Sequence, residues 1–356
     1  MENIVDNLQA KAEKIKKDWA DLLNENPKLR IRDAANQLEA SEAELLATKV
    51  DGENVIRLEG AWDEMVKRFP AFGQVMSITR SEGCVLEHKG AFEKIGVFGK
   101  GMHHMGQVIG PIETRLFFHS WKSAFAVKQP HVRGFQQSVQ FFDKAGDAIT
   151  KVYLKEKGDQ EAFDNFISDY TSSNQDAHQA VEEMAEPATL ALEEVDAEAL
   201  TKGWDELQDT HDFFSLLRKH KAHRLDALKI VEGKHTYQID PATLESMLNV
   251  ASETQMPIMI FAGNRGNIQI HQDVVKKIFP MENWLNIMDP DFNMHLKTDL
   301  IDTAWVVKKP TKDGVVTSIE LFDKDRTLIC QFFGLRKPGS PEREDWRQVV
   351  SDLGQK

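Results

Sequence analysis

His211 is the side chain whose type and spacing suggest metal chemistry most directly. If the surrounding segment is helical, Trp204, Leu207, His211, Phe214 and Leu217 fall on one apolar stripe, at i, +3, +7, +10 and +13. A neutral imidazole on an apolar wall is a good ligand for haem iron, because a porphyrin needs apolar surroundings. A core histidine that makes one hydrogen bond would show the same pattern, so the stripe leaves both interpretations open.

Two further histidine groups carry weaker signals. His220 and His223 lie in a basic segment, 218–224, where no carboxylate or thiolate has matching spacing. We interpret this segment as a solvated electropositive rim that could meet an anionic ligand. His103 and His104 are adjacent, so their side chains point apart and are not expected to bind one ion.

Arg115 stands in an apolar segment that is predicted to be a strand. A buried arginine without a partner is costly, and Glu113 lies two residues away on the same face of a strand. The sequence therefore predicts an ion pair between Arg115 and Glu113.

Several classes of enzyme and of metal site are not supported. The sequence has no phosphate-binding loop, no G-x-S-x-G elbow and no H-E-x-x-H motif. Cys84 and Cys330 form no CxxC pair, so we expect two buried thiols rather than a zinc site or a disulfide framework. The charged N-terminal segment and the absence of a long apolar run predict a cytoplasmic protein without membrane insertion.

The negative charge is concentrated in one segment. Residues 159–200 contain twelve acidic residues and no lysine or arginine, and they account for most of the net charge of −13. We interpret residues 176–200 as a solvated acidic connector, with an acidic interaction segment as the alternative. Because no basic face is visible, we expect no nucleic-acid binding, although short helices near residues 31–46 resemble a helix-turn-helix.

The chain contains an internal duplication. Gly83 and His88 coincide with Gly266 and His271 at an offset of 183 (266 − 83), in segments that both end in Lys-Ile. Further on, VKQP at 127–130 matches VKKP at 307–310, and Ser138 matches Ser318, at an offset of 180. We therefore predict an N-terminal repeat over residues 1–175 and a C-terminal repeat over residues 201–356.

Each repeat is predicted to begin with helices and to continue with strands. Ser41 and Glu44 have the spacing of a capping box, which places a helix start at residue 41. GNRG at 263–266 and KDG at 312–314 are turn signals between apolar runs. Strands joined by short turns indicate antiparallel pairing. The predicted fold class is α+β: a tandem pseudo-repeat of two antiparallel β-sheets, each with flanking helices.

A set of short motifs resembles the HemS/ChuS family of bacterial haem-trafficking and haem-degrading proteins. The resemblance covers nearly the whole chain and is weakest in the acidic connector. It rests on RLF at 115–117, QQSVQFFD at 136–143, HDFF at 211–214, GNRG at 263–266, WLNI at 284–287, AWV at 304–306, KPT at 309–311 and LF at 321–322. The family fold is a tandem pair of antiparallel sheets with helices, in agreement with the prediction above.

The resemblance implies roles for particular residues. His211 matches the proximal ligand of haem iron, and Arg115 matches an arginine that approaches the iron from the opposite face. Arg224 matches a basic residue near the haem propionates. The remaining matches are two polar pocket residues, Lys309 and Gln331, and two residues that would line the haem cavity, Phe117 and Phe261.

Two positions depart from the family pattern. Phe333 stands where related proteins have a tyrosine, which removes one hydroxyl from the implied pocket. His295 of the second repeat corresponds to Arg115 of the first, at the offset of 180, so a second haem site there is an alternative.

The implied ligand is haem b, which would be a substrate as well if the protein is an enzyme. Members of the family are described as haem-degrading enzymes that act in iron utilisation with an external electron donor. They are also described as non-enzymatic carriers that deliver haem to a partner such as a haem oxygenase. Both activities require the same histidine and the same pocket, so the sequence leaves them open.

Overall fold

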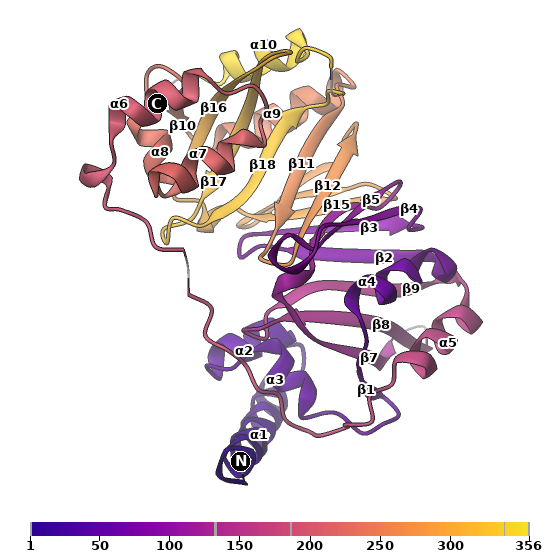
Figure 1. The fold of residues 1–356 in the computed structure, drawn as a ribbon. Coiled ribbons are helices and arrows are strands. Elements are labelled where there is room, and N and C mark those ends of the chain that lie inside the picture. Colours follow the sequence, from indigo (N-terminus) through magenta and orange to yellow (C-terminus); the bar gives the residue numbers. More distant parts are fainter. Residues whose placement is uncertain (1, 132–133, 186, 338, 355–356) are drawn as a thin grey trace. The chain divides into compact units, whose positions relative to one another are not determined.

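The computed structural model describes residues 2–131, 134–185, 187–337 and 339–354 (Figure 1). The first half of the chain contains α1 (Glu2–Glu25), α2 (Ile31–Gln37), α3 (Glu42–Ala47), β1 (Val55–Leu58), α4 (Trp62–Lys67), η1 (Phe69–Phe72), β2 (Gly73–Arg80), β3 (Cys84–Gly90), β4 (Lys94–Phe98), η2 (Gly101–His103), β5 (Met105–Ile109), β6 (Glu113–Phe117), η3 (Phe118–Ser120), β7 (Trp121–His131), β8 (Gly134–Asp143), β9 (Ala148–Gly158) and α5 (Gln160–Tyr170). The second half contains η4 (Leu192–Glu194), α6 (Ala197–Asp205), α7 (Asp212–His220), α8 (Arg224–Ile230), β10 (Thr236–Ile239), α9 (Thr243–Glu253), β11 (Ile258–Gly263), β12 (Asn267–Asp273), β13 (Ile278–Met281), β14 (Trp284–Met288), β15 (Phe292–Lys297), η5 (Thr298–Leu300), β16 (Thr303–Thr311), β17 (Gly314–Phe322), β18 (Leu328–Gly334) and α10 (Glu344–Asp352).

The strands form two antiparallel nine-stranded sheets, which confirms the predicted α+β class. Their orders are β1-β7-β8-β9-β2-β3-β15-β14-β13 and β10-β16-β17-β18-β11-β12-β6-β5-β4. The two orders follow one pattern, because β1, β7, β8, β9, β2 and β3 occupy the places of β10, β16, β17, β18, β11 and β12.

Strand register confirms the duplication residue by residue. In the first repeat Val127 pairs with Ser138, and in the second Val307 pairs with Ser318. Both pairs follow the offset of 180 found in the sequence. The register therefore identifies which residues of the two repeats are structurally equivalent.

The described chain divides into two compact units. The first comprises residues 1–80, 87–185 and 264–269, and the second comprises 81–86, 186–263 and 270–356. The core of the first unit is aromatic, with Phe69 and Phe72 of η1 packed against Phe163 and Phe166 of α5. All four side chains are at most 1% exposed.

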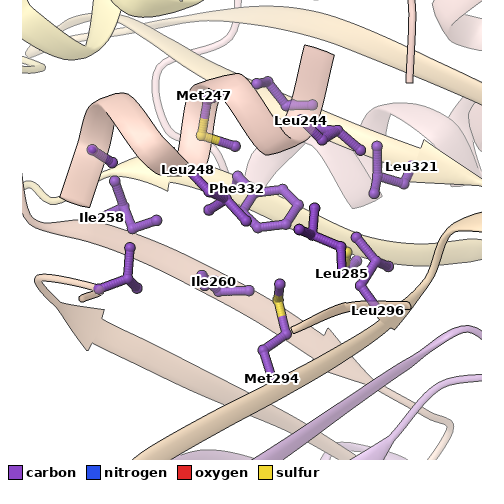
Figure 2. Close-up of a cluster of buried hydrophobic side chains, with 14 of the residues drawn as sticks. Leu244, Met247, Leu248, Ile258, Ile260, Leu285, Met294, Leu296, Leu321 and Phe332 are labelled. Carbon is purple, nitrogen blue, oxygen red and sulfur yellow. The ribbon is translucent and has the colours of Figure 1, made fainter. Parts of the chain in front are cut away.

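The second unit has apolar clusters on both faces of its strands. Helices α9 and α10 cover one face, where Met247 and Leu248 pack on Ile260 and Phe332 (Figure 2). Helices α6, α7 and α8 cover another cluster, which includes Trp204, Phe213 and Trp305. Burial of each such side chain contributes roughly 1.5–3 kcal/mol. This packing fixes the position of α7 on the sheet.

Two local predictions from the sequence are confirmed: the capping box at Ser41 and the two buried thiols. Ser41 caps α3 in a capping box with Glu44, as predicted. Cys84 and Cys330 are both buried free thiols. Within the described residues, no helix has the length and apolar character needed to cross a membrane.

Candidate functional site

The segment before α7 is a turn and not a helix, so the predicted apolar stripe is wrong. Helix α6 ends at Asp205 and α7 begins at Asp212. The Asp209 carboxylate accepts a hydrogen bond from the backbone N–H of His211 at 2.9 Å, and such local side-chain bonds compete with helix formation. As a result His211 is the N-cap residue of α7, and its side chain is 92% exposed rather than set in an apolar wall.

The imidazole of His211 is oriented although it is exposed. Its Nδ1 lies 2.6 Å from Oδ1 of Asp209. Among the described residues, none is hydrogen-bonded to its Nε2. The hydrogen bond from the His211 backbone N–H is the main cause that lowers the pKa of Asp209, so this carboxylate is ionised at neutral pH.

Helix α7 is held close to α6 by a glycine. A Cβ atom at Gly203 would lie only 2.4 Å from Cδ1 of Leu216 on α7, so a larger residue would require the end of the Leu216 side chain to move. Phe213, the second residue of α7, is 1% exposed and packs edge-on against Trp204 at 4.8 Å between ring centroids. The position of His211 is therefore set by the packing of a rigid helix.

Three of the predicted site residues converge on one buried carboxylate, Glu320. Arg224 donates two hydrogen bonds to it, from Nε to Oε2 at 2.7 Å and from Nη2 to Oε1 at 2.8 Å. Lys309 donates from Nζ to Oε1 at 2.8 Å, and Gln331 from Nε2 to the same oxygen at 3.0 Å. Ser318 adds a fifth bond at 3.2 Å. We call these five residues the Glu320 cluster.

The Glu320 cluster carries one surplus positive charge. Burial by itself would raise the pKa of Glu320, but the charges of Arg224 and Lys309 outweigh it and hold that pKa well below its usual range. Burial lowers the pKa of Lys309, and the ionised Glu320 opposes this change. Two cations therefore share one anion at a site that is almost entirely removed from water.

Helix α7 connects His211 with this cluster through aromatic rings. Lys309 Nζ lies 4.6 Å from the ring centre of Phe213, and the Arg224 guanidinium lies 5.1 Å from the same ring. The guanidinium also lies 5.7 Å from the ring of Phe214, which is 56% exposed. Such cation–π contacts contribute roughly 0.5–2 kcal/mol each. Phe214 therefore offers an exposed apolar surface beside the Arg224 guanidinium, on the helix that His211 caps.

Two further aromatic side chains lie on the strand face that carries Gln331. Phe261 of β11 pairs with Gln331 of β18 in the antiparallel register. The Phe261 ring contacts Phe333 edge-on at 5.2 Å between centroids. Both phenylalanines are half-buried. The second unit therefore brings five predicted residues onto α7, α8 and the neighbouring strands: His211, Arg224, Lys309, Gln331 and Phe261.

The other two predicted site residues, Arg115 and Phe117, belong to β6 in the first unit. Arg115 forms the predicted ion pair with Glu113 at 2.9 Å and is 26% exposed. Its counterpart in the second repeat, His295, has Nδ1 at 2.7 Å from Oδ1 of Asn286. The side chain of Phe117 is half-buried.

The basic segment 218–224 is only partly the solvated rim that was predicted. Arg218, Lys219 and Lys221 are exposed. His223 instead caps α8 by accepting the N–H of Leu225. Arg224 is committed to Glu320. Within the described part of the chain, no group of three or more histidine, cysteine, aspartate or glutamate side chains could hold a metal ion.

Sequence reasoning missed Glu320 and Asp209. Glu320 is the one acidic residue in the largely apolar segment SIELF at 318–322, at the end of a strand. A carboxylate that is buried in such a segment requires a cationic partner elsewhere in the fold. Asp209 precedes His211 by two residues, the spacing at which an aspartate bonds the backbone of a turn. Both signals are visible in the sequence once the strand and turn are known.

Comparison with known proteins decides the family. The family model described as the haemin-degrading HemS.ChuX domain matches residues 39–170 and 221–353, one segment in each repeat. The chain belongs to the HemS/ChuX family. Its two matched segments agree with the duplication read from strand order.

Relatives in the HemS/ChuX family align over almost their full length. The hemin transport protein HemS of Yersinia enterocolitica is 36% identical over 338 residues, covering 93% of this chain and 95% of that protein. The crystal structure of holo-PhuS, a heme-binding protein from Pseudomonas aeruginosa, has a TM-score of 0.92 and 41% identity, covering 97% of this chain and 99% of that one. The heme-degrading enzyme ChuS of Escherichia coli O157:H7 has a TM-score of 0.86 and 33% identity, with coverage of 96% and 99%.

The segment of the second repeat that the family model matches contains part of the candidate site. The Glu320 cluster lies inside the matched segment 221–353, whereas His211 lies between the two matched segments. The family match therefore does not extend to the turn that carries His211.

Proposed function

We propose that this protein binds haem b through Nε2 of His211 and serves haem uptake and iron utilisation. The observation that carries the proposal is the oriented, solvent-facing imidazole of His211, two residues from the aromatic ring that covers the Glu320 cluster. Neutral imidazole is a common axial ligand of haem iron. Location in the cytoplasm stays a prediction from the sequence.

The side chains of α7, α8 and the neighbouring strands in the second unit fit the chemistry of haem. A porphyrin offers an apolar ring, which suits the exposed Phe214 and the half-buried Phe261 and Phe333. Its propionates are carboxylates, which suit the surplus charge of Arg224 and Lys309. A propionate that approaches this cluster would share the donors that now serve Glu320. Gln331 would add an uncharged donor.

Arg115 and Phe117 enter the proposal through the resemblance in their segment. As the resemblance implies, Arg115 would supply hydrogen-bond donors to the haem site, and Phe117 would contribute an apolar side chain. Because Glu113 already pairs with Arg115, we expect the guanidinium to be held in a fixed orientation. No nucleic acid is expected as a partner.

We further propose oxidative degradation of haem, with release of iron, as the activity. Bound haem supplies the redox-active iron that such chemistry requires, and electrons come from an external donor. His211 would hold the iron, Arg224 and Lys309 would orient the propionates, and Arg115 would position a polar oxidant. The matched family model is described as haemin-degrading, and a structural relative is described as a heme-degrading enzyme, which supports this reading.

Haem delivery to a partner is the second candidate function. Relatives named as hemin transport proteins favour it. In that case the same residues bind haem reversibly, and a partner such as a haem oxygenase performs the oxidation. The two functions differ in what happens after binding.

An absorption titration with haemin tests binding, and a reductant then separates the two functions. We expect a sharp Soret band that saturates near one haem per chain in the wild type and is weakened or shifted in His211→Ala. An unchanged titration in His211→Ala would contradict the proposed ligand. With reductant, air and catalase present, loss of the Soret band with a biliverdin-like product or released iron indicates degradation. A persistent band indicates a carrier.

A further inference from the structure

We propose that Asp209 is a positioning residue that selects the tautomer of His211 and strengthens the imidazole as an iron ligand. The inference rests on the proposed function, in which His211 binds haem iron. It assigns a role to a carboxylate that does not contact the haem itself.

One oxygen of Asp209 holds His211 at two points. Oδ1 accepts the backbone N–H of His211 at 2.9 Å and lies 2.6 Å from the ring Nδ1. An ionised carboxylate can only accept hydrogen bonds, so Nδ1 must carry the proton. In the neutral ring Nε2 then has the free lone pair. The geometry thus prepares the nitrogen that faces away from Asp209 for coordination.

Asp209 is itself held in place by the first residue of α7. The Asp209 backbone N–H donates to Oδ2 of Asp212, the first residue of α7, at 3.0 Å. The turn between α6 and α7 therefore fixes the carboxylate and the imidazole together. Since α7 is anchored by Phe213 in the core, the direction of the Nε2 lone pair follows from packing.

A carboxylate behind a metal-binding imidazole has known consequences for the metal. It fixes the ring orientation and increases the basicity of the ligand, and loss of such a partner typically lowers metal affinity about 10–100-fold. Greater electron donation also favours the ferric over the ferrous state of haem. A purely structural Asx turn would need only the bond to the backbone N–H. The contact with Nδ1 is the observation that goes beyond it.

Asp209→Asn separates these roles, because asparagine keeps an oxygen acceptor for the turn but removes the charge. Asp212→Asn is the matched control, since it removes a neighbouring charge while its amide oxygen can still accept the Asp209 backbone N–H. Three quantities are measured: the His211 tautomer in the haem-free protein by ¹⁵N NMR at mildly alkaline pH, the rate of haemin transfer to an excess of apomyoglobin, and the reduction potential of bound haem.

In the wild type we expect the Nδ1–H tautomer. In Asp209→Asn we expect haemin to dissociate about 10–100-fold faster and the reduction potential to become more positive. Asp212→Asn should stay close to wild type in both. An Nε2–H tautomer in the wild type would overturn the inference, as would wild-type dissociation and potential in Asp209→Asn while His211→Ala loses the haemin complex. If His211→Ala binds haemin like the wild type, the proposed function itself fails, and the inference fails with it.

Discussion

The two repeats have polar clusters at equivalent positions on equivalent strands, but different residues form them. Strand register makes Gln140 of the first repeat equivalent to Glu320, and Lys151 equivalent to Gln331. The offset of 180 makes Gln129 equivalent to Lys309. The duplicated sheet is thus retained, whereas the charges at its centre have been exchanged.

In the first repeat the buried carboxylate of the cluster belongs to a helix and not to a strand. Glu42 of α3 lies 2.5 Å from Lys151 and 3.6 Å from Arg32, and Arg32 lies 3.2 Å from Asp147. Burial opposes ionisation of Glu42, but Lys151 and Arg32 lower its pKa overall. Arg80 also lowers the pKa of Glu42, so three cations act on a helix carboxylate in the first repeat, whereas two cations, Arg224 and Lys309, act on the strand carboxylate Glu320 in the second.

The equivalent helix termini of the two repeats also carry different residues. His211 is the N-cap residue of α7, the second helix of its repeat, and Arg30 is the N-cap residue of α2, the second helix of the other. The second repeat therefore combines an imidazole at this terminus with the buried Glu320 cluster on its strands. A duplicated fold can thus keep its strand pattern in both repeats while the residues at equivalent positions change.

The largest expected difference between the repeats concerns stability. Glu320→Ala leaves Arg224 and Lys309 buried without their anion, so we expect a loss of about 3–5 kcal/mol in the free energy of unfolding. The equivalent Gln140→Ala removes one hydrogen bond to Ser138 and should cost about 1 kcal/mol. Urea unfolding measures both, and Glu320→Gln serves as a milder variant if Glu320→Ala does not fold. Equal losses at the two positions would contradict the comparison.

The same carboxylate should make the second unit sensitive to acid. The pKa of Glu320 is lowered in the folded state, so its contribution to stability is complete above the unfolded value of about 4.3 and is lost as the pH falls below it. We expect the unfolding free energy of the wild type to decrease with falling pH in this range, and that of Glu320→Gln to decrease less. Urea unfolding across this range tests the prediction, and identical slopes for the two proteins would refute it.

Substitution of Lys309 should weaken haemin binding, whereas substitution of the equivalent residue Gln129 should not. Lys309→Gln removes the surplus charge, and loss of one charge-assisted hydrogen bond corresponds to about tenfold weaker haemin binding. Gln129→Lys in the first repeat should leave haemin affinity unchanged. Absorption titrations measure both affinities, and an equal effect of the two variants would show that the repeats do not divide the roles as proposed.

A smaller effect is expected at Phe333. Phe333→Tyr restores the hydroxyl that the family pattern has at this position, and one added hydrogen bond of about 1 kcal/mol corresponds to a few-fold slower haemin dissociation. Transfer of haemin to an excess acceptor protein gives the rate. Dissociation faster than in the wild type would show that this aromatic face does not adjoin the haem.

The sequence predicted the architecture better than the site. Periodicity, turn signals and the duplication were sufficient for the α+β class, and the spacing of Ser41 and Glu44 located a helix start correctly. The environment of His211 was predicted incorrectly, because helical spacing does not reveal a turn closed by the Asp209 side chain. Convergence of Arg224, Lys309 and Gln331 on Glu320 depends on strand register, which sequence distance does not encode.

The most direct test of a haem ligand confined to the second repeat replaces the proposed ligand by one with a different spectrum. His211→Cys places a thiolate at the N-cap of α7, and Arg30→Cys places one at the equivalent terminus of α2. Absorption and electron paramagnetic resonance spectra of the ferric haemin complexes distinguish thiolate from imidazole ligation. We expect a thiolate signature in His211→Cys and a wild-type spectrum in Arg30→Cys. A wild-type spectrum in His211→Cys would contradict the assignment of His211 as the iron ligand.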